Sequence, residues 1–359
     1  MIKVLHISRT MGQGGAEKVV YQLCKDASSD VKPFVASCGG AYVDELKKVN
    51  VDHLTIPDVE KKIPKVILET FTALNKYIKA NNINVIHTHH RMAAFYGRML
   101  QFVNPRLKHV YTSHNVFYGK KPLLRFALSK ANIVACGMTV KKNLMKEYGI
   151  PADKVRVIYN SIEASNNQEP AVLPELPENA VKIGCIGRIT KQKGFDIFVT
   201  AMKKVVQKNP DAVGILIGDG EDRDKLENMV DALKIRNNIV FLGYQKNVLE
   251  LIKKLDFVVL PSRWEGFPLT PIEVFSANKT IIVSDIENNL EIVRDDKNGL
   301  VFRTEDANDL FVKIMKMIDD PEMKAGFEAQ ASKDYTEKFD YSIFLKKYMN
   351  LYTEIVRKK

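Results

Sequence analysis

Two glutamates, Glu265 and Glu273, lie eight positions apart around a Gly-Phe-Pro turn in the segment SRWEGFPLTPIEVFS. The apolar runs 257–261 and 280–284 on either side predict two buried parallel strands, so the residues between them must cross over as a loop and a helix. Proline is tolerated near a helix start but not in its middle, so we expect the helix to begin near Pro268. Glu265 then lies in the loop at the carboxyl end of a strand, and Glu273 in the first turns of the helix.

This turn suits a ligand that carries phosphates and hydroxyl groups. Gly266 lets the backbone approach a ligand closely, and the free amides that open the following helix suit an anion. Open α/β sheets bind ligands in this crevice, outside the carboxyl ends of their strands. The alternative is that both glutamates are solvated surface charges, and only a second half-site elsewhere in the chain distinguishes the two interpretations.

The sequence EGFPLTPIE resembles the Glu-x7-Glu motif of retaining GT-B glycosyltransferases, specifically glycosyltransferase family four. The resemblance implies that Glu273 accepts hydrogen bonds from the ribose hydroxyls of a nucleotide. It implies that Glu265 lies near the sugar hydroxyls and is not a nucleophile, because the family retains the anomeric configuration by front-face attack, in which a donor phosphate oxygen takes the acceptor proton. The residues between the two glutamates are then expected to bind the donor: Gly266, Phe267, Pro268, Leu269 and Thr270.

Two further elements match the family. Arg188 and Lys193 lie five positions apart in the loop after the predicted strand VKIGCIG, where an arginine fork and a lysine point charge suit a diphosphate. Charged loop residues are by default solvated, but this pair matches the family pattern G-R-x-x-x-x-K-G, which implies that both cations stabilise the departing diphosphate. His114, after another predicted strand, matches a family histidine that contacts the donor sugar near the reacting centre, although a lone histidine is ordinarily a surface or capping residue.

A glycine-rich turn, TMGQGGAEKVV, follows the first predicted strand and opens a helix at about Ala16. Its backbone amides can approach a phosphate or a sugar, but a glycine turn between a strand and a helix is by itself usually structural. The full G-x-G-x-x-G spacing is missing and Lys18 is not placed as in a P-loop, which excludes dinucleotide and ATP fingerprints. The resemblance implies that Gly14 and Gly15 face the donor phosphates and sugar, and that backbone around Phe241 to Gly243 lines the base pocket.

The alternation of apolar strands with segments of helical period predicts an α/β protein built from doubly wound, Rossmann-like domains. With 359 residues and 45% hydrophobic content, the chain has room for two cores. We expect an acceptor-binding domain at 1–165, a proline-containing linker at 166–179 and a nucleotide-sugar-binding domain at 180–339. The resemblance implies the GT-B fold, in which the two domains face each other across a cleft and a last helix, about 340–359, crosses back to the first domain. Strands of the first domain are expected at 3–8, 33–37, 53–56, 85–88, 109–113, 133–136 and 155–159.

The net charge of +11 is placed unevenly. Residues 1–160 carry 25 Lys and Arg against 11 Asp and Glu, whereas the remainder carries 29 against 32. Such a basic field attracts phosphates and anionic surfaces. We interpret the amphipathic segment 63–81 as an ordinary helix with a solvated basic face. The second basic segment, YGKKPLLRFALSK, is interpreted as a site for a membrane surface or an anionic acceptor, through Lys120, Lys121, Arg125 and Lys130.

Metals and cofactors are not indicated. His87, His89 and His90 have no acidic partner nearby in the sequence and are interpreted as structural, and no Asp-x-Asp motif stands where a metal-dependent glycosyltransferase needs one. We therefore expect no metal and no cofactor beyond the nucleotide-sugar donor itself, with a UDP-sugar as the donor. Four widely spaced cysteines without a C-x-x-C pair predict reduced thiols, and the sequence shows neither a signal peptide nor an apolar run of about 18 residues. These features predict a cytoplasmic protein, peripheral on the inner face of the plasma membrane.

The pattern as a whole predicts a retaining hexosyltransferase that moves a sugar to a lipid-linked or other cell-surface glycan precursor, with a polyprenyl diphosphate as the lipid carrier. One alternative is a hydrolysing nucleotide-sugar epimerase of the same architecture, which would convert the donor without an acceptor. Another is a non-catalytic protein that binds an anionic ligand through the basic half. We expect no nucleic-acid partner, because the basic stretch contains no aromatic reader motif.

Overall fold

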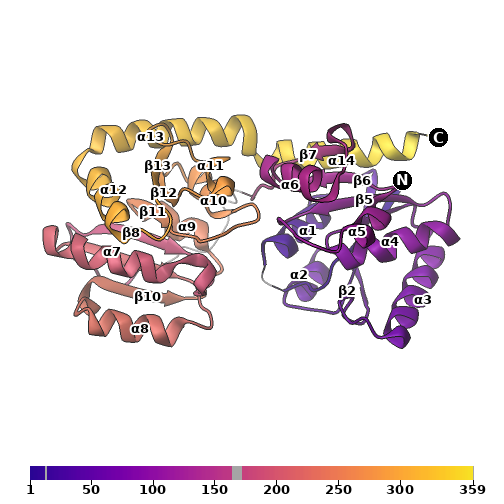
Figure 1. Ribbon diagram of the computed structural model, residues 1–359, viewed down its shortest axis with the longest axis horizontal. Coiled ribbons are helices and arrows are strands. Elements are labelled where there is room, and N and C mark those ends of the chain that lie inside the picture. Colours follow the sequence, from indigo (N-terminus) through magenta and orange to yellow (C-terminus); the bar gives the residue numbers. More distant parts are fainter. Residues whose placement is uncertain (13, 164–171, 359) are drawn as a thin grey trace. The chain divides into compact units, whose positions relative to one another are not determined.

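The computed structural model describes residues 1–12, 14–163 and 172–358 (Figure 1). The chain divides into two compact units: unit 1 comprises Met1–Ile162 together with Tyr341–Lys359, and unit 2 comprises Glu163–Asp340. Of the expected linker, residues 166–171 lie outside the described residues, and residues 172–177 form neither helix nor strand.

Unit 1 contains a seven-stranded sheet whose strands all pair in parallel, in the order β3-β2-β1-β4-β5-β6-β7. The strands are β1 (Ile2–Ile7), β2 (Val31–Ser37), β3 (Asp52–Thr55), β4 (Val85–Thr88), β5 (Lys108–Ser113), β6 (Asn132–Ala135) and β7 (Val155–Val157). The helices are α1 (Gly15–Lys25), α2 (Tyr42–Lys48), α3 (Pro64–Asn81), α4 (Arg91–Val103), α5 (Lys121–Leu128), α6 (Met138–Tyr148) and α14 (Tyr341–Arg357), with a 3-10 turn at Ala152–Lys154. All seven strands expected from the sequence are present, with bounds that differ by at most two residues.

Helices cover both faces of this sheet because successive side chains of each strand point to opposite faces. In β1, Leu5 and Ile7 pack into the apolar cluster that also contains α3 and α4 residues, whereas Val4 packs into the cluster on the other face. The last helix, α14, belongs to that second cluster through a stripe at helical spacing: Phe344, Tyr348, Leu351, Tyr352 and Ile355. Unit 1 is therefore completed by a segment nearly two hundred positions away along the chain from Ile162.

Unit 2 contains a six-stranded parallel sheet in the order β10-β9-β8-β11-β12-β13. The strands are β8 (Val181–Ile186), β9 (Ala212–Ile217), β10 (Ile239–Gly243), β11 (Phe257–Leu260), β12 (Ile281–Ser284) and β13 (Gly299–Phe302). The α-helices are α7 (Phe195–Lys208), α8 (Arg223–Ala232), α9 (Val248–Lys253), α10 (Thr270–Ser276), α11 (Glu287–Leu290), α12 (Ala307–Asp319) and α13 (Pro321–Asp334). Short turns lie at Lys191–Lys193 and Arg236–Asn238, both 3-10, and at Tyr335–Phe339, which is a π-turn.

The crossover after β11 departs slightly from expectation. Helix α10 begins at Thr270 and not at Pro268, because Pro268 belongs to the preceding turn and Pro271 takes the early helical position that tolerates a missing amide. Glu265 lies in the loop and Glu273 in the first turn of α10, as the sequence predicts.

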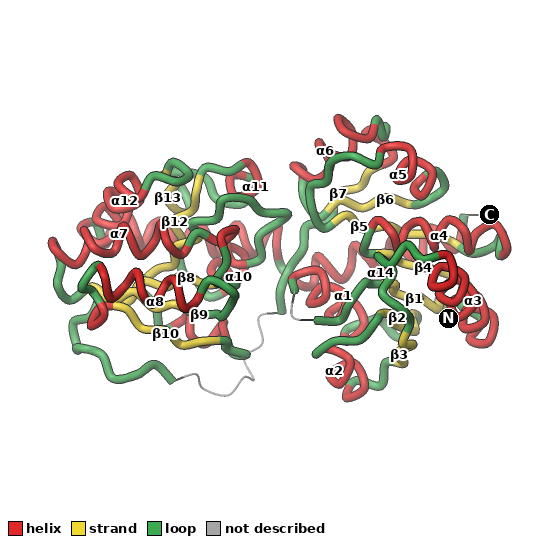
Figure 2. Tube along the Cα trace, turned by 60° about the horizontal axis from the view of Figure 1, so that its bottom comes forward, coloured by secondary structure: helices red, strands yellow, loops and turns green. Residues whose placement is uncertain are grey.

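Each sheet has one position at which the strand order reverses, and Figure 2 shows the strands of both sheets between flanking helices. The reversal lies between β1 and β4 in unit 1 and between β8 and β11 in unit 2. At such a position the loops leave the sheet in opposite directions and open a crevice at the carboxyl ends of the strands. The residues after these four strands are therefore the first to consider for a site. Among the residues that the structure describes, no helix is both long and apolar enough to cross a membrane.

Candidate functional site

The reversal position of unit 2 holds a buried ion pair between Lys193, which follows β8, and Glu265, which follows β11. The Lys193 Nζ atom donates a hydrogen bond to Glu265 Oε1 at 2.6 Å, and the Ser262 hydroxyl donates to the same oxygen at 2.6 Å. The side chains of Lys193 and Glu265 are only 18% and 7% exposed. The fold thus brings together two predicted site residues that lie 72 positions apart.

Two glycines allow Lys193 to reach this position. Gly194 has a φ of +67°, and a Cβ atom there would lie 2.1 Å from the carbonyl oxygen of Pro261, at the end of β11. Gly187 has a φ of +145°, and its missing side chain leaves room for the Lys193 methylenes, which lie 3.3 Å from the place of a Cβ atom. The glycines on either side of Arg188 and Lys193 are therefore required by close packing at a left-handed backbone position.

Arg263 fastens the loop after β11 to the turn that carries Lys193. Its guanidinium forms a two-bonded pair with Asp196, at 2.9 and 2.7 Å, and also donates to Glu305 and to the carbonyl of Lys191. Its backbone amide donates to the carbonyl of Gln192 at 2.8 Å. The hydrogen bonds that the Arg263 guanidinium donates to the Asp196 and Glu305 carboxylates hold the pKa of Arg263 above its usual value. Sequence reasoning missed Arg263, although it lies two positions before Glu265 and shortly after the end of β11.

A second set of polar contacts supports the same loop from β12 and α11. Asn288 donates its amide to the carbonyl of Gly266, and the Ser284 hydroxyl donates to the carbonyl of Ser262 at 2.5 Å. Asn289 donates to the Ser284 hydroxyl oxygen at 3.0 Å. These side chains are buried, so the loop that carries Glu265 is held by protein hydrogen bonds on the side away from solvent.

The remaining predicted donor residues of unit 2 are distributed around this pair. Arg188 lies in the same loop as Lys193 and is exposed, and its side chain makes no hydrogen bond or ion pair with any residue that the structure describes. Phe267, Pro268 and Thr270 are buried in the turn between the two glutamates, and Glu273 is half-buried on α10.

Phe241 and Gly243 belong to β10, two strands away from β8. The Phe241 ring lies beneath the guanidinium groups of Arg223 and Arg236, at 5.7 and 5.3 Å. The structure thus brings Lys193 and Glu265 into contact and places these β10 residues at the other end of the half-sheet.

The glycine-rich turn of unit 1 opens α1. Gly14 is the residue before the helix, in an extended conformation, and Gly15 is its first residue, while Gln13 between Gly12 and Gly14 lies outside the described residues. A Cβ atom on Gly14 would lie 2.3 Å from the Glu17 carboxylate, which also accepts a hydrogen bond from the Thr10 hydroxyl at 2.8 Å. The negative charge in the first turn of α1 therefore comes from Glu17, a residue of the helix itself.

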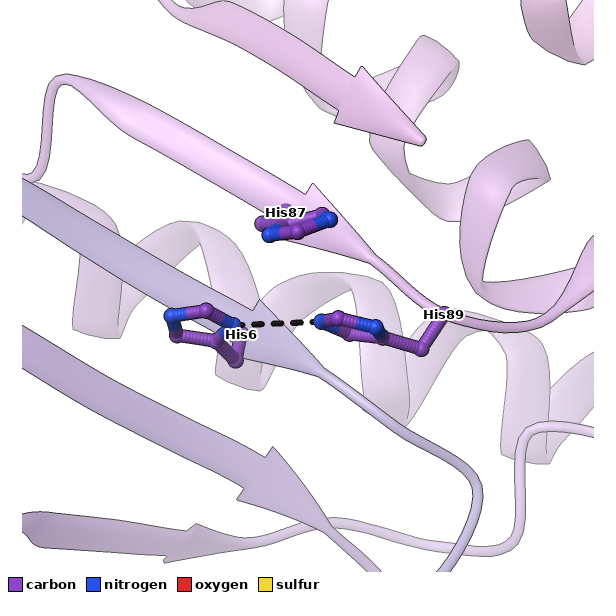
Figure 3. A group of neighbouring side chains, drawn as sticks. All are labelled: His6, His87 and His89. Atoms are coloured by element: carbon purple, nitrogen blue, oxygen red, sulfur yellow. Dashed lines mark hydrogen bonds between the residues drawn. The ribbon is translucent and has the colours of Figure 1, made fainter. Parts of the chain in front are cut away.

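The reversal position of unit 1 holds four histidines in mutual contact. His6 belongs to β1, His87 to β4, and His89 and His114 to the loops directly after β4 and β5. Figure 3 shows three of them, with the ring edges of His6 and His89 facing each other and the His87 ring beside them. We interpreted His87 and His89 as structural from the sequence, and neither His6 nor the contact of His89 with His114 was foreseen.

Burial determines the charge of these imidazoles. Loss of solvent lowers the pKa of His6 and of His114 to about 3, and lowers the pKa of His87 and His89 well below the usual value. Each histidine is therefore neutral at pH 7, with one N–H donor and one acceptor nitrogen.

The two basic segments of unit 1 differ in how their apolar side chains are buried. In α3, Leu74 and Ile78 are buried and Lys65, Lys76 and Lys79 are exposed, as in an ordinary helix on a sheet. In α5, Leu124 and Leu128 are buried, whereas Leu123 and Phe126 remain partly exposed at 36% and 39%.

The α5 surface combines these apolar side chains with four exposed cations: Lys120, Lys121, Arg125 and Lys130. Phe126 stacks with the exposed Phe102 of α4 at 6.2 Å, and the Arg98 guanidinium lies over both rings. The like charge of nearby Lys62 lowers the pKa of Lys120. The α5 surface thus combines exposed apolar side chains with several positive charges close to one another.

Comparison with known proteins gives two family matches that together cover most of the chain. Residues 13–166 match the model "Glycosyltransferase Family 4", and residues 171–334 match "Glycosyl transferases group 1". The chain is also 24% identical over 345 residues to an Escherichia coli protein named UDP-Gal:alpha-D-GlcNAc-diphosphoundecaprenol alpha-1,3-galactosyltransferase, covering 89% of this chain and 88% of that one.

Solved structures resemble the chain over nearly its whole length. A glycosyltransferase from Rickettsia africae has a TM-score of 0.88 at 21% identity, covering 100% of this chain and 99% of its own. The Anabaena protein HepE in complex with UDP has a TM-score of 0.83 at 19% identity, covering 98% and 100%. At this identity the likeness shows the fold, and it confirms the predicted class of two Rossmann-like units of the GT-B type.

Proposed function

The chain belongs to the GT-B glycosyltransferases that join a family 4 unit to a group 1 unit, and from this premise we propose a retaining hexosyltransferase that uses a UDP-sugar. The acceptor we propose is a glycan precursor linked to a polyprenyl diphosphate. The two family matches favour a transferase over the hydrolysing epimerase and over the non-catalytic anion-binding protein.

The observation that carries the proposal is the Lys193–Glu265 pair beside the exposed Arg188. In glycosyl transfer the bond between the anomeric carbon and a phosphate oxygen breaks, and negative charge grows on the departing diphosphate. Cations that are already positioned where this charge develops stabilise the transition state more than the ground state. Lys193 has three N–H donors, so it can keep its bond to Glu265 while it donates to a phosphate oxygen.

The same contacts support a role for Glu265 in holding the sugar. One of its oxygens already accepts from Lys193 and Ser262, so the carboxylate is fixed in position and its other oxygen remains an acceptor for a sugar hydroxyl. A carboxylate held in this way is a poor nucleophile, in agreement with a front-face mechanism in which a donor phosphate oxygen takes the acceptor proton. Glu273 would bind the ribose hydroxyls.

The other predicted residues complete the proposed donor site. His114 would orient the sugar, the backbone at Gly14 and Gly15 would face the phosphates, and the backbone at Phe241 and Gly243 would line the base pocket. Since Arg188 and Lys193 supply the positive charge that the diphosphate needs, we propose that the reaction requires no metal ion.

The names of similar proteins support the choice of donor and acceptor. The Escherichia coli relative is named for UDP-Gal and for a diphosphoundecaprenol acceptor, and HepE has been crystallised with UDP. A lipid-linked acceptor would place the enzyme at a membrane, and the α5 surface offers exposed Leu123 and Phe126 among four cations. Each such cation contributes about 1 kcal/mol near an anionic surface. We therefore propose a cytoplasmic enzyme that is peripheral on the inner face of the plasma membrane.

The test is calorimetric binding of UDP, GDP and ADP to the native chain and to Glu273→Ala and Lys193→Met. We expect binding of UDP in preference to the others. Each variant should weaken it by roughly 10-fold or more, since a hydrogen bond to a charged group contributes about 1.5–3 kcal/mol. Lys191→Met is the matched control, because Lys191 belongs to the same turn but its side chain is exposed.

Two outcomes would contradict the proposal. If none of the three nucleotides binds, the charged loops of unit 2 do not form a nucleotide site, and the anion-binding alternative gains. If UDP-sugars are epimerised or hydrolysed at full rate without any lipid acceptor, the epimerase is the correct assignment.

A further inference from the structure

Three histidines of unit 1 form a continuous chain of hydrogen bonds between ring nitrogens. His6 Nδ1 lies 3.1 Å from His89 Nε2, and His89 Nδ1 lies 2.9 Å from His114 Nε2. His89 is the middle member, and both of its nitrogens are engaged by other imidazoles. The chain runs across the strand reversal from β1 to the loop after β5, and it ends at the residue predicted to orient the sugar.

A neutral histidine in the middle of such a chain allows only two arrangements. Each N···N bond needs one N–H and one lone pair, and neutral His89 has one of each. If His89 carries its proton on Nδ1, it donates to His114 and must accept from His6, so all three rings are Nδ1–H. If it carries its proton on Nε2, all three rings are Nε2–H. Mixed arrangements would leave two lone pairs or two N–H groups facing each other.

His87 lies against this chain without being part of it. Its Nδ1 is 2.7 Å from the hydroxyl of Tyr352, and its Nε2 is 2.7 Å from the hydroxyl of Thr112. Its ring lies at 4.1 Å from the His89 ring, between centroids. These two hydroxyl groups can each donate or accept, so they accommodate either tautomer of His87 and leave it uncoupled from the tautomers of the other histidines.

A metal ion is the competing explanation for such a cluster, because ring nitrogens of His6, His87 and His89 lie within 4.8 Å of one another. Zinc takes histidine nitrogens at about 2.0–2.1 Å with their lone pairs converging on one point. Here both nitrogens of His87 and both nitrogens of His89 already lie at hydrogen-bonding distance from other groups. A metal would have to break several of these bonds, so the geometry favours the hydrogen-bonded chain.

We propose that His89 and His6 are positioning residues that fix the ring orientation and the tautomer of His114. The remaining nitrogen of His114, Nδ1, is shielded from solvent and has no hydrogen-bond partner among the described residues. If His114 Nδ1 becomes accessible to a sugar hydroxyl, that hydroxyl would meet an N–H in one arrangement and a lone pair in the other. The functional consequence rests on the proposed sugar transfer, but the coupling of the three tautomers does not.

The experiment is 15N NMR of histidine-labelled full-length protein, with long-range correlations that identify the protonated nitrogen of each ring. We expect His6, His89 and His114 to share one tautomer. His89→Phe should leave His114 in a mixture of tautomers, and His6→Phe should change His114 although a second ring lies between them. His89→Asn, whose amide offers a donor and an acceptor, should partly restore a single His114 tautomer.

Tyr352→Phe is the matched control, because it removes the hydroxyl from His87 and leaves the three-histidine chain intact. Unlike tautomers among the three histidines in the native protein would overturn the proposal. So would stoichiometric Zn2+ binding that shifts the His6, His87 and His89 nitrogens together.

A kinetic readout separates this proposal from the proposed function. If UDP-sugar is a substrate, His89→Phe should lower kcat by roughly 10-fold with little change in KM, since none of the proposed base, ribose or phosphate contacts involves His89 or His114. If UDP-sugar is not a substrate, the proposed function fails, but the NMR measurement of the three tautomers still tests the histidine chain. If His89→Phe leaves kcat and the His114 tautomer unchanged, His89 does not position His114.

Discussion

The two strand reversals of the molecule hold opposite kinds of chemistry. In unit 1 the carboxyl ends of β1, β4 and β5 carry neutral imidazoles that share protons through hydrogen bonds. In unit 2 the carboxyl ends of β8 and β11 carry a lysine and a glutamate that pair as ions. All seven histidines of the chain belong to unit 1, and unit 2 has none. The difference shows that the same position in two similar sheets can hold neutral hydrogen-bonded rings or a charged pair, depending on the side chains placed there.

The net charge of each unit does not match the charge of the cluster at its strand reversal. Unit 1, with the uncharged cluster, has 30 Lys and Arg against 12 Asp and Glu, while unit 2 has 24 against 31. In unit 1 the cations therefore lie at the surface and the cluster beneath is desolvated. In unit 2, Lys193 and Arg263 lie in the loops and are each paired with a carboxylate, whereas Arg188 in the same region is exposed.

Acidification should separate the two units most strongly. The pKa of His6 and of His109 is lowered by burial to about 3, whereas an unfolded histidine titrates near 6.5. Between these values the unfolded chain binds more protons, so stability is complete above pH 6.5 and falls as the pH drops toward 3. Each residue removes about 1.4 kcal/mol per pH unit, so unit 1 should lose on the order of 4 kcal/mol by pH 5.

Hydrogen exchange measured at pH 7 and pH 5, corrected for the intrinsic rates, can follow peptides from β1 and β4 separately from those of β8 and β11. We expect the first pair to lose protection and the second pair to keep it over this range. Equal loss in both units would show that the buried histidines do not control the acid response.

A pair of glycine substitutions tests how tightly the charged site of unit 2 is built. Gly194→Ala places a methyl group 2.1 Å from a carbonyl oxygen, whereas Gly149→Ala in unit 1 has the same left-handed backbone, with a φ of +63°, and no atom within 4 Å. Gly149→Ala should lower the free energy of unfolding by about 1 kcal/mol and Gly194→Ala by about 3 kcal/mol. Urea titration measures both free energies of unfolding. Similar losses would mean that the turn carrying Lys193 can shift to accommodate the added methyl group.

The smallest expected effect concerns the charged surfaces. Lys120→Ala combined with Arg125→Ala should weaken binding to vesicles of anionic phospholipid by about 2 kcal/mol, roughly 30-fold, because each cation contributes about 1 kcal/mol. The control is Lys208→Ala with Lys246→Ala, two exposed lysines of unit 2. Sedimentation with vesicles measures the binding, and added salt should weaken it. If added salt does not weaken the binding, or if the control variant weakens it equally, α5 does not form the membrane-binding surface.

Much of this organisation could be predicted from the sequence because it depends on local signals. The strands of unit 1 were predicted to within two residues from apolar runs between helical segments. Lys193 and Glu265 were both predicted as site residues from their spacing to Arg188 and Glu273 in loops after predicted strands, and from the family motifs that these pairs match. Their direct ion pair was not predicted, since the Gly194 contact that makes it possible depends on how β8 and β11 lie side by side.

The histidine chain could not be predicted for a similar reason. His6 looks like a polar interruption in an apolar strand. The predicted doubly wound fold places β1 beside β4, but it does not show that the rings of His6 and His89 meet. Tyr352 bonds to His87 across 265 positions, and Tyr348 lies 3.1 Å from Thr112 across 236. These contacts depend on long-range parallel strand pairing and on a helix distant in the sequence. The hydrophobic periodicity of the sequence does not show which side chains meet in this way.

The position of α14 has a consequence for how the protein is made. The β-strands of unit 1 are translated before unit 2, yet the apolar cluster on one face of their sheet lacks Phe344, Tyr348, Leu351, Tyr352 and Ile355 until α14 is translated. Unit 2 is contiguous and is translated completely before that moment. Unit 1 therefore cannot complete its core before unit 2 has been translated, and until then it exposes an apolar surface that a chaperone can bind.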